Sequence, residues 1–270
     1  MNLLVEEISK KAKEHRRTIL KVINKTGKGH VGGAFSCIDI LCAIYYGGIA
    51  NISLESFNKR DRNKVILSKG HSCISQYVIF EDLGLIEEND LYSMNMGGIL
   101  GEHPDPRIPG IDFISGSLGH GLGVATGIAL SSKLDGIENS TFVILGDGEC
   151  YEGSIWEAAM LASHLKLTNL IAIVDRNNLC IHGNTEDINQ LEPFSDKWKS
   201  FGWNVLQIDG HDISDIVLSL DKRHKTMPTV IIANTIKGKG ISFMENKISW
   251  HHGDIDDDTL RISLEELNGD

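Results

Sequence analysis

Asp147 and Asn177 are the residues with the clearest chemical potential, because each one follows an apolar segment that reads as a strand. Residues 141–145 run into the tripeptide GDG around Asp147, and residues 170–174 run into DRNN, which contains Asn177. A helical pattern of apolar residues separates the two segments. Strand, crossover helix and strand predict a βαβ unit, whose parallel strands bring both loops to the same edge of the sheet. We therefore expect Asp147 and Asn177 to lie side by side where open α/β sheets bind ligands.

The two loops offer mainly oxygen atoms. Asp147 supplies a carboxylate oxygen, Asn177 an amide oxygen and the turning backbone near Leu179 a carbonyl oxygen. These ligands are too few to enclose a metal, but they suit Mg²⁺, which shares its coordination sphere with water and substrate phosphates. Gly146 and Gly148 allow a close approach of the backbone, and the helix that follows offers free N–H groups to a phosphate. The pattern therefore predicts a metal-bridged diphosphate site, with Ca²⁺ or Mn²⁺ as substitutes for Mg²⁺. The alternative is that the Asp is a helix cap and the Asn a turn residue.

The rest of the chain alternates strand-like and helix-like segments. This alternation predicts an α/β fold, a parallel sheet with helices on both faces, in one domain over residues 1–270 with an acidic tail from about residue 253. Ser36, with Asp39 three residues on, is a capping pattern that predicts a helix start. The expected helices span residues 3–26, 36–46, 74–83, 118–134, 196–201 and 213–222. The other expected strands span residues 64–68, 205–208 and 229–233, and loops cover 95–116 and 184–193.

Composition restricts the class of partner. The net charge of −11 argues against nucleic acid and anionic membrane surfaces. A negative protein that binds an anionic cofactor needs a local metal or basic patch, which agrees with the Mg²⁺ prediction. We expect no membrane span, since no apolar run is long enough, and no signal peptide, since the amino terminus reads as a charged helix. The five cysteines show no paired spacing, which favours reduced thiols in a cytoplasmic protein.

Six motifs in order along the chain resemble the amino-terminal half of transketolase. They are GKGHVGGAFS, LSKGHSC, GEHP, GSLGHGLG, the pair GDG…NN with its flanks YEGSIWEA and VDRNN, and KGKGISFMEN. GDG followed by NN also resembles the thiamine diphosphate motif. The resemblance implies a thiamine diphosphate-binding (PP-type) fold and a chain that is similar to the amino-terminal subunit of a split transketolase.

The resemblance assigns roles to loop histidines that are otherwise most simply solvated side chains. It implies that His71 contacts the cofactor diphosphate and the donor sugar. It also implies that His30 and His103 bind sugar hydroxyls and move protons. A fourth histidine follows the KGKG motif, and either His251, which we place first, or His252 fills this position; both imidazoles are suited to meeting an anion or carrying a proton.

Further positions follow from the same resemblance. Glu152 is implied to belong to a carboxylate relay between paired cofactors, although it also reads as a first-turn acid that stabilises a helix dipole. His120 stands at a position where transketolases often carry glutamine, so the resemblance assigns this side chain no contact. Lys237 and Lys239 either reach phosphates or form a solvated turn. The expected catalytic residues are His30, His71, His103, His251 and Glu152. The expected cofactor contacts are His71, Gly116, Leu118, Gly146, Asp147, Gly148, Glu149, Asn177, His251 and His252, and the expected metal ligands are Asp147, Asn177 and Leu179.

The glutamate that activates thiamine diphosphate lies, in transketolases, in the next domain. The resemblance therefore implies a partner, a carboxy-terminal transketolase subunit with the pyrimidine-binding domain, and a dimer of heterodimers as a closed assembly. The implied reaction transfers a two-carbon ketol unit from a ketose or its phosphate to an aldose, as in the pentose phosphate pathway. The rival functions are the alpha subunit of a thiamine diphosphate-dependent 2-oxo acid dehydrogenase and a non-catalytic regulatory subunit. The loop histidines argue against the first, and the intact Asp147, Asn177 and loop histidines argue against the second.

Overall fold

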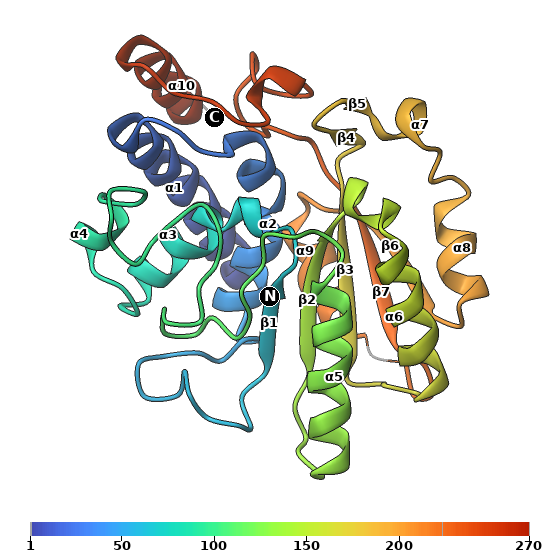
Figure 1. Ribbon diagram of the computed structural model, residues 1–270. Coiled ribbons are helices and arrows are strands. Elements are labelled where there is room, and N and C mark those ends of the chain that lie inside the picture. Colours follow the sequence, from blue (N-terminus) through green and yellow to red (C-terminus); the bar gives the residue numbers. More distant parts are fainter. Residues whose placement is uncertain (1, 223, 270) are drawn as a thin grey trace.

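A parallel sheet forms the centre of the protein, in a computed structural model that describes residues 2–222 and 224–269. Its described strands are ordered β1-β2-β3-β7-β6, all parallel, which confirms the expected α/β class (Figure 1). The strands are β1 (Lys64–Leu67), β2 (Thr141–Gly146), β3 (Leu170–Arg176), β6 (Asn204–Asp209) and β7 (Thr229–Asn234). In the register of β2 with β3, Gly146 lies opposite Asp175, so the GDG and DRNN loops start at the same edge.

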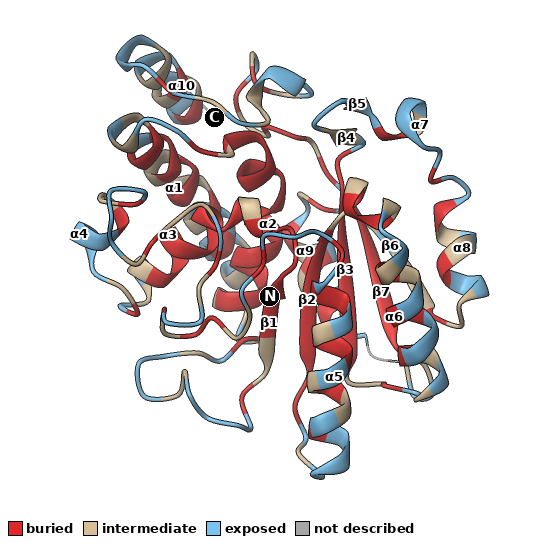
Figure 2. Cartoon of the chain, viewed as in Figure 1, coloured by how far each residue is buried: buried red, intermediate tan, exposed pale blue. Residues whose placement is uncertain are grey.

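Helices cover both faces of the sheet. Side chains alternate along each strand, so a strand of apolar residues presents an apolar surface on both faces. Phe142 and Ile144 of β2 belong to one apolar cluster, whereas Val143 and Leu145 belong to the other. The first cluster is covered by helices α1 (Asn2–Thr26), α2 (Val31–Tyr46), α3 (Ile74–Asp82) and α9 (Ile213–Leu220). The second is covered by α5 (Gly121–Leu134), α6 (Gly153–His164) and α8 (Phe194–Ser200). Figure 2 shows the buried strands between helices whose outer sides are exposed.

Short elements follow the strands and shape the loops. They are the 3₁₀ turns η1 (Gly70–Ser72), η2 (Gly148–Tyr151) and η3 (Ile248–Trp250), the helices α4 (Glu88–Leu91) and α7 (Thr185–Ile188), and the strands β4 (Leu179–Cys180) and β5 (Gly183–Asn184). β4 and β5 pair as an antiparallel hairpin directly after β3. We call the edge of the sheet at the carboxyl ends of the parallel strands the carboxyl edge. The opposite edge, where the strands begin, is the amino edge.

The helix expected to start at Ser36 starts at Val31, so that prediction is wrong. Ser36 lies inside α2, where its hydroxyl donates to the Asp175 carboxylate at 2.6 Å instead of capping the helix. Gly32 and Gly33 form the first turn of α2, and a Cβ on Gly32 would meet the Trp250 carbonyl oxygen at 2.6 Å. These glycines therefore let the helix pack closely against its neighbours.

Other boundaries differ by a few residues, as is usual at helix ends. Helix α5 starts at Gly121 instead of residue 118, since Gly119 has a φ of +89° that ends the preceding turn. Helix α8 starts at Phe194 instead of residue 196, and the expected loop 184–193 contains the single turn α7. The long loop over residues 95–116 is irregular, as expected.

The acidic tail is an ordered part of the fold. Its helix α10 (Asp257–Gly269) buries Leu267 against the core, and Arg17 of α1 donates to the Leu267 carbonyl oxygen at 2.7 Å. The tail acids Asp254, Asp256, Asp257, Asp258 and Glu265 are exposed, whereas Glu266 is half-buried and accepts hydrogen bonds from the N–H and the hydroxyl of Ser242. Within residues 2–222 and 224–269, no helix combines the length and apolar character needed to cross a bilayer.

Candidate active site

A cavity of about 310 Å³ opens at the carboxyl edge between the loops that follow β1, β2 and β3. Its lining brings together Asp147, Asn177 and Leu179, the three expected metal ligands, with the histidines His71 and His251. Gly146, Gly148, Glu149 and Leu118 also line it. The expected metal ligands of the βαβ unit and two histidines from separate loops therefore line the same cavity.

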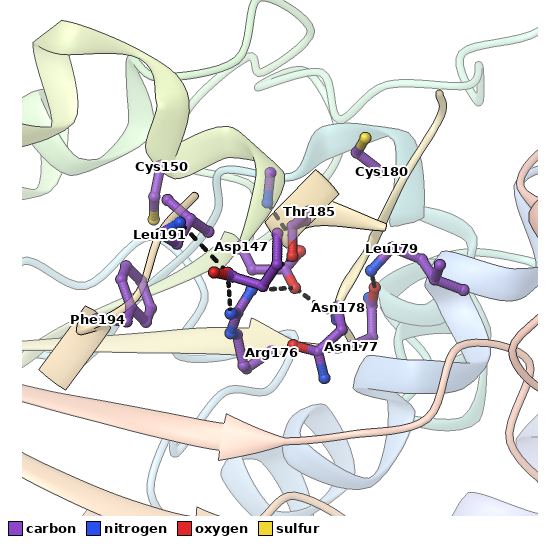
Figure 3. Close-up of polar contacts among 12 residues, drawn as sticks. Asp147, Cys150, Arg176, Asn177, Asn178, Leu179, Cys180, Thr185, Leu191 and Phe194 are labelled. Carbon is purple, nitrogen blue, oxygen red and sulfur yellow. Dashed lines mark hydrogen bonds and ion pairs between the residues drawn. The ribbon is translucent and has the colours of Figure 1, made fainter. Parts of the chain in front are cut away.

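Asp147 is buried at the start of η2 and faces the DRNN loop (Figure 3). Its Oδ1 accepts a hydrogen bond from the Gly148 N–H at 2.8 Å, and its Oδ2 accepts one from the Asn178 N–H at 2.6 Å. Asp147 is thus a cap, yet Oδ1 keeps one acceptor position, because a carboxylate oxygen accepts two bonds. Burial, and then the charge of Asp175, raises the pKa of Asp147, although Arg176 and the backbone donors oppose this change. A divalent cation would favour the charged carboxylate.

Asn177 and Leu179 present their oxygens beside Asp147. The Asn177 Oδ1 accepts a hydrogen bond from the Leu179 N–H at 3.1 Å and keeps a second acceptor position. The next residue, Asn178, has a φ of +63°, a turn conformation that Asn tolerates well. The Leu179 carbonyl oxygen accepts from Lys237 Nζ at 3.1 Å. One carboxylate, one amide and one carbonyl oxygen make a hard donor set, which fits Mg²⁺.

Arg176 ties the segment 185–192 to Asp147. Its guanidinium lies 3.3 Å from Asp147 Oδ2 and donates to Thr185 Oγ1 at 2.8 Å (Figure 3). It also donates to Glu186 at 2.6 Å and to Glu192 at 3.2 Å. The sequence pattern alone assigned Arg176 no role. An arginine at the end of an apolar strand was the signal that could have revealed it, since a charge buried there requires partners.

A second buried ion pair lies below the cavity. Lys69 donates from Nζ to the Gly33 carbonyl oxygen at 3.0 Å and forms an ion pair with Asp175. Ser36 and Thr235 also donate to this carboxylate. Burial alone would lower the pKa of Lys69, but Asp175 outweighs it and raises the value to about 12. Lys69 lines the cavity as a permanent cation, a function that its place in the LSKGHSC motif did not reveal.

Lys237 is the other buried cation of the cavity. Burial, and then the charge of Lys69, lowers the pKa of Lys237 to about 8. Its Nζ lies 2.8 Å from His251 Nδ1, so a protonated Lys237 donates to this nitrogen and leaves the proton of the neutral ring on Nε2. Lys239 lies apart and faces Glu245 at 3.6 Å. Of the two lysines in the KGKG motif, only Lys237 lines the cavity.

Three imidazoles gather above these cations. The ring centroids of His30 and His71 are 5.2 Å apart, and His251 lies 5.4 Å from His71 and 5.6 Å from His30. Burial lowers the pKa of all three, to about 4 for His30 and about 3 for His251, and well below the usual range for His71. Neighbouring cations add to the effect, Lys69 at His71 and Lys237 at His251. These rings are therefore neutral near pH 7, able to accept or donate hydrogen bonds.

The other expected site residues occupy less central positions. Both carboxylate oxygens of Glu149 are engaged by the protein, through Ser68 and the N–H groups of Gly119 and Gly146. Glu152 is exposed at the start of α6 and forms no side-chain cap there.

His103 and Gly116 lie side by side and outside the cavity lining. His103 is exposed, and its charge is one of the smaller effects that lower the pKa of His30. His252 also lies outside the lining and contacts Glu102 at 3.2 Å, so His251 is the histidine of this pair that reaches the cavity.

Comparisons with known proteins place these features in a family. The family model described as "Transketolase, thiamine diphosphate binding domain" matches residues 8–268. An apulose-4-phosphate transketolase subunit of Phocaeicola vulgatus is 40% identical over 253 residues, which are 92% of this chain and 89% of that protein. The 6-deoxy-6-sulfo-D-fructose transketolase subunit SqwG of Clostridium sp. (strain MSTE9) is 40% identical over 256 residues, 93% of each chain.

Solved structures agree with this assignment. The transketolase of Campylobacter jejuni subsp. jejuni superimposes with a TM-score of 0.87 at 25% identity, covering 98% of this chain and 43% of that chain. The chain thus spans less than half the length of that transketolase and nearly the whole length of the two subunit relatives. These matches confirm the resemblance found in the sequence motifs. The chain belongs to the transketolase family, as a thiamine diphosphate-binding domain of the kind found in separate subunits.

Proposed function

We propose that this chain holds thiamine diphosphate and Mg²⁺ at its carboxyl edge. With a second subunit that carries a pyrimidine-binding domain, it would transfer a two-carbon ketol unit from a ketose to an aldose. The observation that supports this most strongly is the joint lining of one cavity by three hard oxygen ligands, two buried lysines and neutral histidines. The subunit names of these two relatives support the requirement for a partner.

In this proposal Asp147, Asn177 and the Leu179 carbonyl supply three oxygens to Mg²⁺. Water and the diphosphate would complete its coordination. Lys69 and Lys237 supply positive charge in a chain whose net charge is −11, which offsets the charge of an anionic ligand. Arg176 positions Asp147 through a buried ion pair, which fixes the carboxylate before any ligand arrives.

The cofactor, once bound, supplies the electron sink for cleavage of a carbon–carbon bond beside a carbonyl group. The histidines of this chain would serve the sugar. His71, His30 and His251 are neutral near pH 7, so the rings of His71 and His30 can each donate to one hydroxyl and accept from another. His251 holds a single tautomer because Lys237 occupies its Nδ1, which leaves Nε2–H as the donor. These rings orient hydroxyls and carry protons between them.

We extend the proposal to assembly and location. A dimer of heterodimers would bring two copies of each chain into a closed symmetric complex. The substrates would be a ketose and an aldose, either free or phosphorylated. A reducing compartment such as the cytoplasm would suit the free cysteines that the structure describes at positions 37, 42, 73, 150 and 180.

Reconstitution with candidate partners tests the proposal. The chain is coexpressed with pyrimidine-domain subunits, and each mixture is assayed with ketose and aldose pairs in the presence of thiamine diphosphate and Mg²⁺. We expect turnover that requires both chains and that disappears with Asp147→Asn. Turnover of 2-oxo acids with a lipoamide acceptor would instead favour a dehydrogenase subunit. Tight cofactor binding without turnover in every mixture would favour a regulatory subunit.

A further inference from the structure

Two histidines and a glutamate converge next to the cavity. The potential ligand atoms of His30, Glu102 and His252 all lie within 4.8 Å of one another. His252 Nε2 is 3.2 Å from Glu102 Oε1, and the ring centroids of His30 and His252 are 4.4 Å apart. Donors bound to one tetrahedral ion at about 2.1 Å lie roughly 3.4 Å apart. Small side-chain rotations would therefore bring the three donors into range of a single ion.

The backbone fixes two of the three donors relative to each other. Gly29 and Gly253 form an isolated antiparallel bridge, with hydrogen bonds of 3.0 Å and 3.1 Å in the two directions. His30 directly follows Gly29, and His252 directly precedes Gly253. Residues more than two hundred positions apart are thus held side by side without help from the imidazoles. A site built on such a fixed backbone binds better because less order is lost on binding.

We propose that His30, Glu102 and His252 form a binding site for one divalent ion of the zinc class. Two imidazoles and one carboxylate make up a common zinc ligand set, with a fourth position left for water or a substrate oxygen. Imidazole nitrogen favours zinc over magnesium, whereas the all-oxygen set at Asp147 favours magnesium, so the two sites select different ions. The side chains of Glu102 and His252 are 32% and 36% exposed, which gives an ion access from solvent.

A metal ion bound to His30 would interfere with binding of the sugar substrate. His30 lies 5.2 Å from His71 and 5.6 Å from His251, the two histidines of the cavity lining. An ion that occupies His30 removes one ring from the group that orients hydroxyls and lowers turnover. This consequence rests on the proposed function, whereas the metal site does not.

Titration of the purified chain with zinc chloride tests the site. Excess Mg²⁺ is present throughout, and calorimetry records the heat of binding. We expect one zinc equivalent in the wild-type chain, and affinity at least about tenfold weaker in both Glu102→Gln and His252→Gln. The matched control is His164→Gln, at an exposed histidine of α6 that lies outside the trio, with unchanged affinity. Thermal unfolding confirms that each variant is folded.

Two results would overturn the site. One is unchanged zinc affinity in both ligand variants, and the other is loss of binding in Cys180→Ser, which would assign the ion to the half-buried thiol. Substitution of Co²⁺ for zinc separates these cases, because only thiolate ligation gives an intense sulfur-to-metal absorption band. In a reconstituted enzyme, zinc should lower turnover, and a zinc-selective chelator that leaves the Mg²⁺ in place should restore it. Absence of turnover with every partner would contradict the proposed function while leaving the zinc stoichiometry intact.

Discussion

The two edges of the sheet both carry a cavity, but they bury very different groups. The amino edge has the larger one, about 580 Å³ against about 310 Å³ at the carboxyl edge. The charged residues that line the cavity at the amino edge are all exposed, namely Lys133, Glu138, Lys166 and Lys225. The carboxyl edge instead buries Lys69, Asp147, Glu149 and Lys237 in its lining.

Buried charge, and not volume, therefore distinguishes the cavity where we propose cofactor binding from the cavity at the amino edge. A buried charge costs several kcal/mol unless it is paired, so a fold keeps one where it has a use. The buried polar residue Asn139 of the amino edge serves the backbone, because its amide donates to the carbonyl oxygens of Arg60 and Arg62. At the carboxyl edge, Asp147 and Asn177 keep acceptor positions that the protein leaves open.

Asp147→Asn is expected to have the largest effect. The substitution keeps the size of the side chain and removes the charge that an Mg²⁺ ion would meet. We expect Mg²⁺-dependent affinity for thiamine diphosphate to fall at least roughly 100-fold, the upper end of the losses seen for groups that only support a ligand. Calorimetry with and without Mg²⁺ measures this change. Glu138→Gln at the amino edge is the matched control, and an equal loss there would erase the contrast between the edges.

Arg176→Lys is expected to have the next largest effect. Lysine keeps the positive charge but cannot bridge Asp147, Thr185 and Glu186 with one planar group. We expect cofactor affinity in the presence of Mg²⁺ to fall about 10- to 100-fold, because Asp147 loses its support. Limited proteolysis should also cleave the segment 185–192 faster.

The control for this prediction is Arg261→Lys. Arg261 is exposed on α10 and pairs with Glu265 on the same helix. Equal behaviour of the two lysine variants would show that Arg176 only adds to general stability. Affinity measured separately from the free energy of unfolding distinguishes the two roles.

His15 is a buried titratable group that lies outside the cavity at the carboxyl edge, so its titration should affect the stability of the fold and not cofactor binding. Its Nε2 lies 2.7 Å from the hydroxyl of Tyr46, which itself donates to Asp82, so the proton of a neutral ring completes this chain of bonds. Burial lowers the pKa of His15 from 6.5 to about 4, against the opposing charge of Asp82. Between these values the unfolded chain binds a proton that the folded chain does not. Stability from this group is therefore complete above about pH 6.5 and falls as the pH drops towards 4.

His15→Gln tests this separation. Since one pKa unit is worth about 1.4 kcal/mol, the wild-type chain should lose at most roughly 2 kcal/mol through His15 between pH 6.5 and pH 5. The free energy of unfolding of the variant should fall less between pH 6.5 and pH 5, by the amount that His15 contributes. Urea unfolding at both pH values measures this difference. Cofactor affinity at pH 7 should stay unchanged. His164→Gln, at an exposed ring, should keep the full loss, and identical curves for the wild type and His15→Gln would contradict the assignment.

Lys133→Ala at the amino edge is expected to have the smallest effect. The Lys133 ammonium donates to the carbonyl oxygen of Leu165 at 2.7 Å, near the end of α6. Loss of this exposed contact should change the free energy of unfolding by roughly 0.5 kcal/mol and leave cofactor affinity within the error of calorimetry. A tenfold loss of affinity would mean that the larger cavity also takes part in binding.

The βαβ unit and the meeting of its two loops could be predicted from the sequence because they depend on local pattern. Apolar strands, a crossover helix and polar residues at the strand ends are all visible in the stretch 141–178. The same local patterns predicted the α/β class, the long loop over residues 95–116 and most element boundaries to within a few residues.

The charges that hold the site could not be predicted in this way, because their partners lie far apart in the chain. Lys69 and Asp175 are separated by 106 positions, and Ser36 and Asp175 by 139. Ser36 shows the limit most clearly. Its capping pattern is a local signal, but a buried hydrogen bond to a distant strand determines its place. The common role of the histidines in three separate loops was predicted from the family motifs, because periodicity carries no information about it.

A crystal structure with both ligands tests whether the carboxyl edge holds the metal and the diphosphate. The chain is crystallised with thiamine diphosphate and Mn²⁺, and the ion is located by its anomalous scattering. We expect a peak bound by Asp147, Asn177 and the Leu179 carbonyl oxygen, with the diphosphate as a further ligand. A peak only at His30 and His252, or a diphosphate bound away from the carboxyl edge, would contradict it.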